Sequence, residues 1–287
     1  MDKIPVRNIS SSLKEPDLSG TFSIRKLDAL LSGQDMVQEL HRHSFFYVLI
    51  LEKGTGEHSI DFVPYPVSDH AVFFMRPGQV HQLMLKHDST GYLMSFTNDF
   101  YAPLKRSASE VLRKVSNKNH YLPDAEQFKK LLSILSGIFQ EYSDKQEGYL
   151  DVIQSSLDIF LIALMRQSRN PESPSNSGNE YMQERLEELQ TLIALHISAQ
   201  KQVAYYANKL HITPYQLNAI TKTTLGKTCS EVINDYILLE AKRYLLATPN
   251  QVNQIAWHLG YDDVSYFIRF FKKHTGSSPD TFRKNFR

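Results

Sequence analysis

Two groups of side chains in this 287-residue sequence could bind a ligand, a metal ion or a polyanion. The first group consists mainly of histidines. His41 and His43 are separated by one residue, Tyr47 follows shortly after, and His81 comes just after a Pro-Gly turn sequence. Because side chains alternate along a strand, His41, His43, Phe45 and Tyr47 would share one face of an extended segment. If the strands are neighbours, His43, Tyr47 and His81 would line one interior and provide polar contacts among aromatic rings, as small-molecule sites do.

Three interpretations of these histidines remain open: an effector site, a metal site, or histidines that are merely packed or on the surface. Three imidazoles could hold a metal ion. Metal-dependent cupin proteins, however, combine His-x-His and a later His with a Glu, and Tyr47 and Val48 stand where that Glu would be. The sequence therefore favours an effector such as a sugar or an aromatic compound, and we expect no metal or other cofactor. A ligand-binding or metal-dependent cupin enzyme with a helical interaction domain is the alternative, but no catalytic triad, phosphate-binding loop or motif-placed acid pair accompanies it.

The second group lies near the C-terminus, in QIAWHLGYDDVSYFIRFFKKHTGSSPDTFR (254–283). Phe267, Phe270 and Phe271 recur at the i, i+3, i+4 spacing of a helix, so we expect all three to be buried. The remaining surface of that helix then presents Ser265, Tyr266, Ile268, Arg269, Lys272 and Lys273. Hydroxyl and guanidinium groups can contact base edges, and lysines can contact phosphates.

The same pattern occurs about fifty residues upstream. Ala207 and Leu210 match Ala256 and Leu259 at an offset of 49. At an offset of 50, Leu217, Ile220 and Gly226 match Phe267, Phe270 and Gly276. Thr213-Pro214 supplies a helix N-cap followed by Pro at the first helical position. Each copy is a short helix, a tight turn and a longer helix, which predicts two helix-turn-helix motifs. In the first copy the outward residues are Tyr215, Gln216, Asn218, Ala219 and Lys222. A helical interaction domain without nucleic acid is the competing interpretation.

The elements that must position these groups fall into three regions. Evenly spaced β-rich segments within residues 20–100 predict a barrel or sandwich, with strands at 45–54, 58–67, 70–78, 80–87 and 91–96. Residues 124–168 predict two helices separated by the EGY sequence near 148. Their apolar stripes would be either a hairpin packed on the barrel or a dimer surface. RNPESPSNSGN (169–179) predicts a flexible linker, and the rest of the chain is expected to be helical. The fold class is α+β with several domains.

Charge and composition restrict the partners. Residues 1–200 carry 20 Lys and Arg against 25 Asp and Glu, a net charge of −5, whereas residues 201–287 carry 12 against 6, a net of +6. The basic C-terminal region favours a polyanion partner. A single cysteine excludes an internal disulfide framework and a cysteine-rich zinc site. The first twenty residues do not read as a signal peptide, and no apolar run approaches membrane-spanning length, so we expect a cytoplasmic, nucleoid-associated protein without membrane contacts.

The C-terminal third resembles the DNA-binding domain of the AraC/XylS family of bacterial transcription regulators. The resemblance lies in EAKRYLL (240–246), QIAWHLGYDDVSYFIRFFKKHTG (254–276) and SSPDTFR (277–283). It implies that each recognition helix enters a major groove, about 34 Å from the other along the DNA. The residues that it places in base-reading or phosphate-contacting positions are Tyr215, Gln216, Asn218, Ala219, Lys222, Val264, Ser265, Ile268 and Arg269. Arg269 is the strongest candidate for a base contact, because arginine to guanine is the commonest specific one. Ile237 departs from the family, which usually has an arginine there.

The N-terminal part resembles the rest of such regulators less specifically. The resemblance implies a cupin-like effector-binding and dimerisation domain at 1–168, a linker at 169–179 and an AraC-type DNA-binding domain at 180–287. It further implies effector contacts from His41, His43, Tyr47 and His81, and a homodimer formed through residues 124–168. Double-stranded promoter DNA and RNA polymerase are the expected partners. An effector would alter the dimer or the contacts around the linker, and so change promoter activity.

Overall fold

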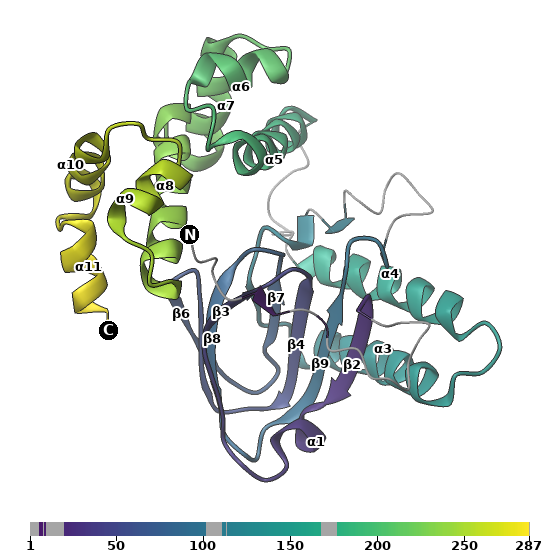
Figure 1. The fold of residues 1–287 in the computed structure, drawn as a ribbon. Coiled ribbons are helices and arrows are strands. Elements are labelled where there is room, and N and C mark those ends of the chain that lie inside the picture. The colour runs from purple at the N-terminus through teal and green to yellow at the C-terminus, as the bar shows by residue number, and fades with distance from the viewer. Residues whose placement is uncertain are drawn as a thin grey trace. The chain divides into compact units, whose positions relative to one another are not determined.

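The computed structural model describes residues 6–7, 9, 20–101, 111–112, 114–167 and 177–286, and the chain divides into two compact units between Glu172 and Ser173 (Figure 1). Most of the predicted linker 169–179 lies outside the described residues. Its last residues are helical, because helix α5 begins at Ser177.

The first unit contains two five-stranded sheets, in agreement with the predicted barrel or sandwich. One sheet has the order β1 (Val6–Arg7), β3 (Met36–His43), β8 (Val80–Leu85), β5 (Gly56–Ile60), β6 (Val63–Val67). The other has the order β10 (His120–Tyr121), β7 (Val72–Met75), β4 (Phe46–Lys53), β9 (Thr90–Phe96), β2 (Phe22–Lys26). A short helix, α1 (Leu27–Leu31), interrupts the region that was expected to be all strand. The chain passes from one sheet to the other between His43 and Phe46.

The segment 58–67 is not one strand, as its composition predicted, but parts of a hairpin. Strands β5 and β6 pair antiparallel through a turn at Asp61 and Phe62, which both have positive φ, 50° and 67°. Two successive residues of this kind form the turn type whose twist suits tight hairpins. Pro64 and Pro66 are tolerated because β6 is an edge strand, where a missing N–H breaks no ladder.

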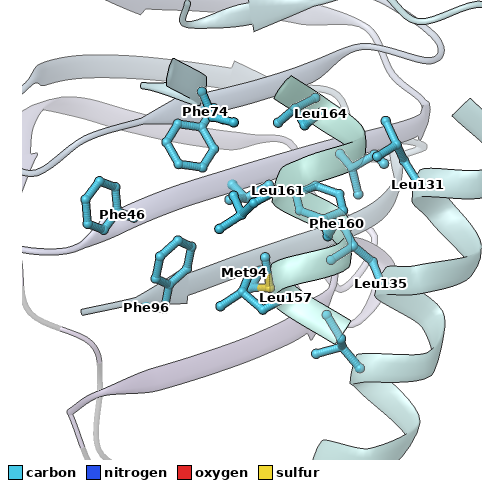
Figure 2. Close-up of a cluster of buried hydrophobic side chains, with 14 of the residues drawn as sticks. Phe46, Phe74, Met94, Phe96, Leu131, Leu135, Leu157, Phe160, Leu161 and Leu164 are labelled. Carbon is cyan, nitrogen blue, oxygen red and sulfur yellow. The ribbon is translucent and has the colours of Figure 1, made fainter. Parts of the chain in front are cut away.

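Strand β4 separates two hydrophobic layers because its side chains alternate. Tyr47, Leu49 and Leu51 point between the two sheets. Phe46, Val48 and Ile50 point to the opposite face and join a second cluster with α3 (Ala125–Asp144) and α4 (Tyr149–Gln167). Figure 2 shows Phe46, Phe74, Phe96 and Met94 facing the leucines of both helices. The apolar run from Phe46 to Leu51 in β4 therefore reflects burial on both faces.

The two predicted helices of 124–168 are present and turn at Gly148, whose φ is +77°. The predicted stripe of α4 is buried throughout, and that of α3 is buried except for its last member, Tyr142, which is half-buried. Both stripes pack on the sheet containing β4 (Figure 2). They are thus the packing surface of a hairpin, and a dimer surface on these helices would need other residues.

The second unit is helical, as predicted, and contains two similar helix pairs. Its helices are α5 (Ser177–His196), α6 (Val203–Lys209), α7 (Pro214–Leu225), α8 (Cys229–Ala247), α9 (Val252–His258), α10 (Val264–Thr275) and α11 (Pro279–Asn285). Pairs α6–α7 and α9–α10 are the two predicted copies, joined by α8. Gly226 and Gly276 end α7 and α10 in the left-handed conformation. Among the helices that the structure describes, none is long and apolar enough to span a bilayer.

Candidate DNA-binding surface and ligand site

Helix α10 is held in place by its ends and by one apolar face. The Asp263 carboxylate accepts hydrogen bonds from the backbone N–H groups of Ser265 and Tyr266, at 2.7 and 3.2 Å, and so caps the N-terminus. Phe267 and Phe271 are fully buried, and Phe271 meets Phe282 of α11 with ring centroids 5.5 Å apart. The opposite face of the helix is exposed to solvent.

The structure places the predicted contact residues of α10 on that opposite face. Ser265, Arg269, Lys272 and Lys273 are exposed, while Val264 and Ile268 are half-buried. The Arg269 side chain is 69% exposed, and one guanidinium nitrogen lies 3.8 Å from the Asp263 carboxylate. An exposed pair at that distance contributes little to stability, so the guanidinium can move to another anion.

Phe270 is only half-buried, which corrects the prediction that all three phenylalanines are in the core. Its ring lies at the edge of the cluster, 5.9 Å from Tyr261 and 4.8 Å from His274. The position is explained by the 100° step of the helix, which carries the i+3 residue to the margin of a narrow stripe.

Helix α7 presents an equivalent surface, but two of its predicted residues also hold the fold together. Tyr215 is 84% exposed, and Ala219 and Lys222 are exposed as well. The Gln216 side-chain oxygen accepts hydrogen bonds from the backbone N–H and the hydroxyl of Thr213, which completes a capping box. That leaves its amide N–H₂ as the group that can point outward.

Of these two residues, Asn218 uses both ends of its side-chain amide in hydrogen bonds within the fold. Its side-chain N–H₂ donates to the carbonyl of Pro214, and its oxygen accepts from the backbone N–H of Cys229 at 2.9 Å. The second bond joins α7 to the first residue of α8. Asn218 therefore has a structural role that its outward position in the sequence pattern did not indicate.

The long helix α8 joins the two copies, and the SSPDTFR segment contacts the C-terminal end of α8. Ile237 is buried in α8, so an apolar side chain fits the position where the family usually has an arginine. Arg243 is also buried and forms an ion pair with Glu240. Arg283 donates to the carbonyls of Leu245, in the last turn of α8, and of Asn250, in the loop after it, at 2.8 and 2.6 Å.

In the first unit, the predicted histidines converge between the sheets. His41 and His43 come from β3, His81 from β8 and Tyr47 from β4, and all four side chains are buried. His43 Nε2 lies 2.8 Å from His81 Nε2, and His81 Nε2 lies 3.1 Å from His41 Nε2. The Tyr47 ring is stacked on that of His43, with centroids 5.2 Å apart.

Two further histidines belong to this interior and were missed by the sequence analysis. His58 of β5 is fully buried, and its Nε2 lies 2.8 Å from His81 Nδ1. His120 of β10 stacks on Phe73 with ring centroids 4.8 Å apart. His58 could have been found from the inward position of Ile60 two residues later, once 56–60 was known to be a strand.

Burial determines the protonation of these two histidines. Desolvation, reinforced by the neighbouring imidazoles, lowers the pKa of His58 to about 3. Desolvation and Lys118 lower the pKa of His120. His58 is therefore neutral at physiological pH, with one ring nitrogen as donor and the other as acceptor.

Both units match known families. Residues 27–153 match the AraC-like ligand binding domain, and residues 206–285 match the Helix-turn-helix domain. RhaS of Escherichia coli O157:H7, a transcriptional activator, is 24% identical over 256 residues that cover 85% of this chain and 87% of its own length. RhaR of Yersinia pseudotuberculosis, also an activator, is 20% identical over 86% of this chain and 84% of its own. The solved structure of ToxT from Vibrio cholerae is 12% identical, with a TM-score of 0.44, over 92% of this chain and 98% of that one.

The two-unit fold with its paired helix-turn-helix motifs defines a DNA-binding transcription regulator that carries a ligand-binding domain. The chain belongs to the AraC family of transcription regulators. Its relatives are transcription regulators and not enzymes, which argues against the cupin-enzyme alternative.

Proposed function

We propose that this protein activates transcription by binding specific promoter sequences through α7 and α10, under the control of a small ligand bound among the histidines of the first unit. The main observation in favour of DNA binding is that α10 has one buried apolar face and one exposed polar face. Phe267 and Phe271 fix one side, while Ser265, Arg269 and Lys272 stay exposed on the other. In this proposal, Arg269 reads a base and the lysines contact phosphates.

The base-reading surface combines residues of both copies. From α10 it takes Val264, Ser265, Ile268 and Arg269, with Lys272 and Lys273 on the phosphates. From α7 it takes Tyr215, the Gln216 amide N–H₂, Ala219 and Lys222, with Asn218 at its margin. The relatives RhaS and RhaR are activators by name, which supports activation by this protein. Contact with RNA polymerase at the promoter is a further part of the proposal.

A binding experiment with Arg269→Ala tests the DNA part. Genomic fragments are first screened by gel shift for the site that binds best, and affinity is then measured on that site and on random DNA. Loss of a base contact should weaken binding to the selected site by about 1–3 kcal/mol, or roughly 5- to 150-fold, with a smaller effect on random DNA. Lys272→Ala should weaken both complexes about equally and reduce the salt dependence, because it removes a phosphate contact.

Arg42→Ala is the matched control, since it removes one arginine from the first unit and should leave both affinities unchanged. An equal loss on the two DNAs for Arg269→Ala would make Arg269 a phosphate contact. Binding that is indifferent to salt would contradict the proposed surface as a whole.

The ligand part of the proposal rests on the interior that His41, His43, Tyr47 and His81 share. It has imidazole and phenol groups surrounded by aromatic rings, which suits a small hydroxylated or aromatic ligand. A ligand that binds the folded chain raises its melting temperature. A thermal-shift screen of the full chain against sugars and aromatic acids should therefore identify the class, and His43→Gln should abolish the shift.

Homodimer formation is proposed through the outer face of α4. Val152 and Ile159 lie two helical turns apart on that face and are exposed, unlike the stripe that packs on the sheet. A pair of such apolar side chains on a second copy would bury both.

A further inference from the structure

The three histidines of the first unit are arranged so that their Nε2 atoms meet. His41 lies directly opposite His81 in the pairing of β3 with β8, and His43 lies two residues further along β3. Their ligand atoms all fall within 4.8 Å of one another, and all three side chains are buried. Two of the Nε2–Nε2 distances are 2.8 and 3.1 Å.

Groups behind the rings hold two of them in orientations that suit a metal ligand. His41 Nδ1 lies 2.6 Å from the carbonyl oxygen of Glu39. Because a carbonyl can only accept, the proton of His41 is on Nδ1, and its Nε2 carries the lone pair. His58 Nε2 lies behind His81 Nδ1 in the same manner, at 2.8 Å. Backbone carbonyls and side-chain acceptors of this kind fix the tautomer of metal-binding histidines.

The spacing and the chemistry select the class of ion. An ion with metal–nitrogen bonds of about 2.0–2.1 Å in tetrahedral geometry separates its ligand nitrogens by about 3.3 Å. The His43–His81 and His81–His41 pairs, at 2.8 and 3.1 Å, would need to move apart by only a few tenths of an ångström. An all-imidazole set suits Zn²⁺, Co²⁺, Ni²⁺ or Cu²⁺, whereas Mg²⁺ and Ca²⁺ require oxygen ligands.

Size also favours an ion at this point. His41, His43, His58 and His81 are packed against one another at hydrogen-bond distance, so an organic ligand must push side chains apart to reach the nitrogens. A single ion needs only the small separation of the rings described above. Three histidines also leave a tetrahedral ion one open position, which an oxygen or nitrogen of an organic effector can take.

We propose that the Nε2 atoms of His41, His43 and His81 bind one divalent transition-metal ion, and that His58 is a positioning residue behind His81. This inference rests on the proposed function, since it names the chemistry of the ligand site in the first unit. In the metal-bound state His81 carries its proton on Nδ1, and this N–H donates a hydrogen bond to His58 Nε2.

The test uses the full chain, stripped with a chelator and dialysed. Zn²⁺ is titrated by calorimetry and Co²⁺ by visible absorption, whose intensity reports tetrahedral coordination. We expect one ion per chain and an intense Co²⁺ spectrum. His43→Gln and His81→Gln should each abolish that spectrum, and His87→Gln, a change at an exposed histidine beside Asp35, should leave it intact.

His58 is tested by a pair of variants. His58→Gln retains an acceptor for His81 and should bind nearly as tightly as the natural chain. His58→Leu removes that acceptor and should weaken binding by about 10- to 100-fold, with the stoichiometry unchanged. Circular dichroism of each metal-free variant identifies any that fails to fold, and the titration of the unsubstituted chain does not depend on them.

The proposal is overturned if the unsubstituted chain binds neither ion at micromolar concentrations, or if His43→Gln and His81→Gln bind as it does. A sugar or aromatic acid that stabilises the chain without metal would then preserve the ligand site while the metal is rejected. The Arg269→Ala experiment is independent of both results, because it tests the second unit.

Discussion

Replacement of Gly260 by alanine should destabilise the second unit by an amount that can be worked out from its surroundings. Gly260 follows α9 with φ +71°, and its carbonyl accepts a hydrogen bond from Lys201 Nζ at 2.7 Å. A Cβ at this position would lie 1.6 Å from the carbonyl oxygen of Ser198, just beyond α5. The left-handed conformation costs about 1–2 kcal/mol for a residue with a Cβ. Displacing the backbone at Ser198 is a form of overpacking and costs about 1–3 kcal/mol more.

The Gly260→Ala variant should therefore lose about 2–5 kcal/mol of unfolding free energy. Urea denaturation followed by tryptophan fluorescence measures it, because Trp257 of α9 is the one tryptophan in the sequence and reports on the second unit. DNA affinity measured in parallel should fall as well, since the turn sets the angle between α9 and α10.

Two matched variants separate the contributions. Gly226→Ala has nearly the same φ, +68°, but its Cβ would meet nothing within 4 Å, so only the conformational cost of about 1–2 kcal/mol remains. His211 occupies the equivalent turn of the first copy at φ 55°, so the position tolerates a side chain there. His211→Gly should change stability by less than about 1 kcal/mol, because relief of strain offsets the added freedom of the unfolded chain. Equal losses for Gly260→Ala and Gly226→Ala would refute the close approach of Ser198.

Three other perturbations follow from the structure. Because the pKa of His58 falls to about 3 on folding, the unfolded chain binds one more proton between about pH 6.5 and 3. The free energy of unfolding of the metal-free protein should therefore be highest above pH 6.5 and fall by about 1.4 kcal/mol per pH unit below it. Denaturation curves of His58→Leu at several pH values should show a smaller dependence of this free energy on pH. An unchanged dependence would mean that another group titrates. Asn218→Ala should cost about 0.5–2 kcal/mol of stability by removing the acceptor for the Cys229 N–H, and an unaffected urea midpoint would show that this cap is dispensable. Leu157→Ala should cost about 2–5 kcal/mol of stability, because Leu157 is fully buried. Ile159→Ala should cost much less and shift sedimentation from dimer towards monomer; a loss of stability as large as that of Leu157→Ala would contradict the exposed position of Ile159.

Sequence patterns predicted the local features well because local interactions produce them. The cap at Thr213 was predicted from the sequence, and at the start of α10 the sequence offered Asp262 or Asp263, of which the structure uses Asp263. Each is a contact between residues two or three apart. The stripes of Phe267 and Phe271 in α10 and of Leu157 in α4 follow from helical periodicity in the same way. One local error, Phe270, concerns the width of a stripe, which depends on what packs against it. The other is the segment 58–67, which was predicted as one strand but turns at Asp61 and Phe62.

Features that join distant segments were beyond the sequence patterns. His58 meets His81 because β5 pairs with β8 in the register that sets Ile60 opposite His81, and a shift by one residue would turn His58 outward. Asn218 had an outward position on its own helix, yet its oxygen caps α8. The stripes of 124–168 fitted packing and dimerisation equally well until the sheet beneath them was known.

The sequence by itself thus determined the helix pairs, their caps and their repeat, and through them the family of regulators. Periodicity and capping act within a few residues, so they can be recognised in the sequence itself. Only the tertiary structure showed that four buried histidines share one interior. It also showed that the Asn218 side chain forms a hydrogen bond to α8 and that a side chain at Gly260 would collide with Ser198. These depend on strand register and helix docking, which are set by the packing of the whole unit.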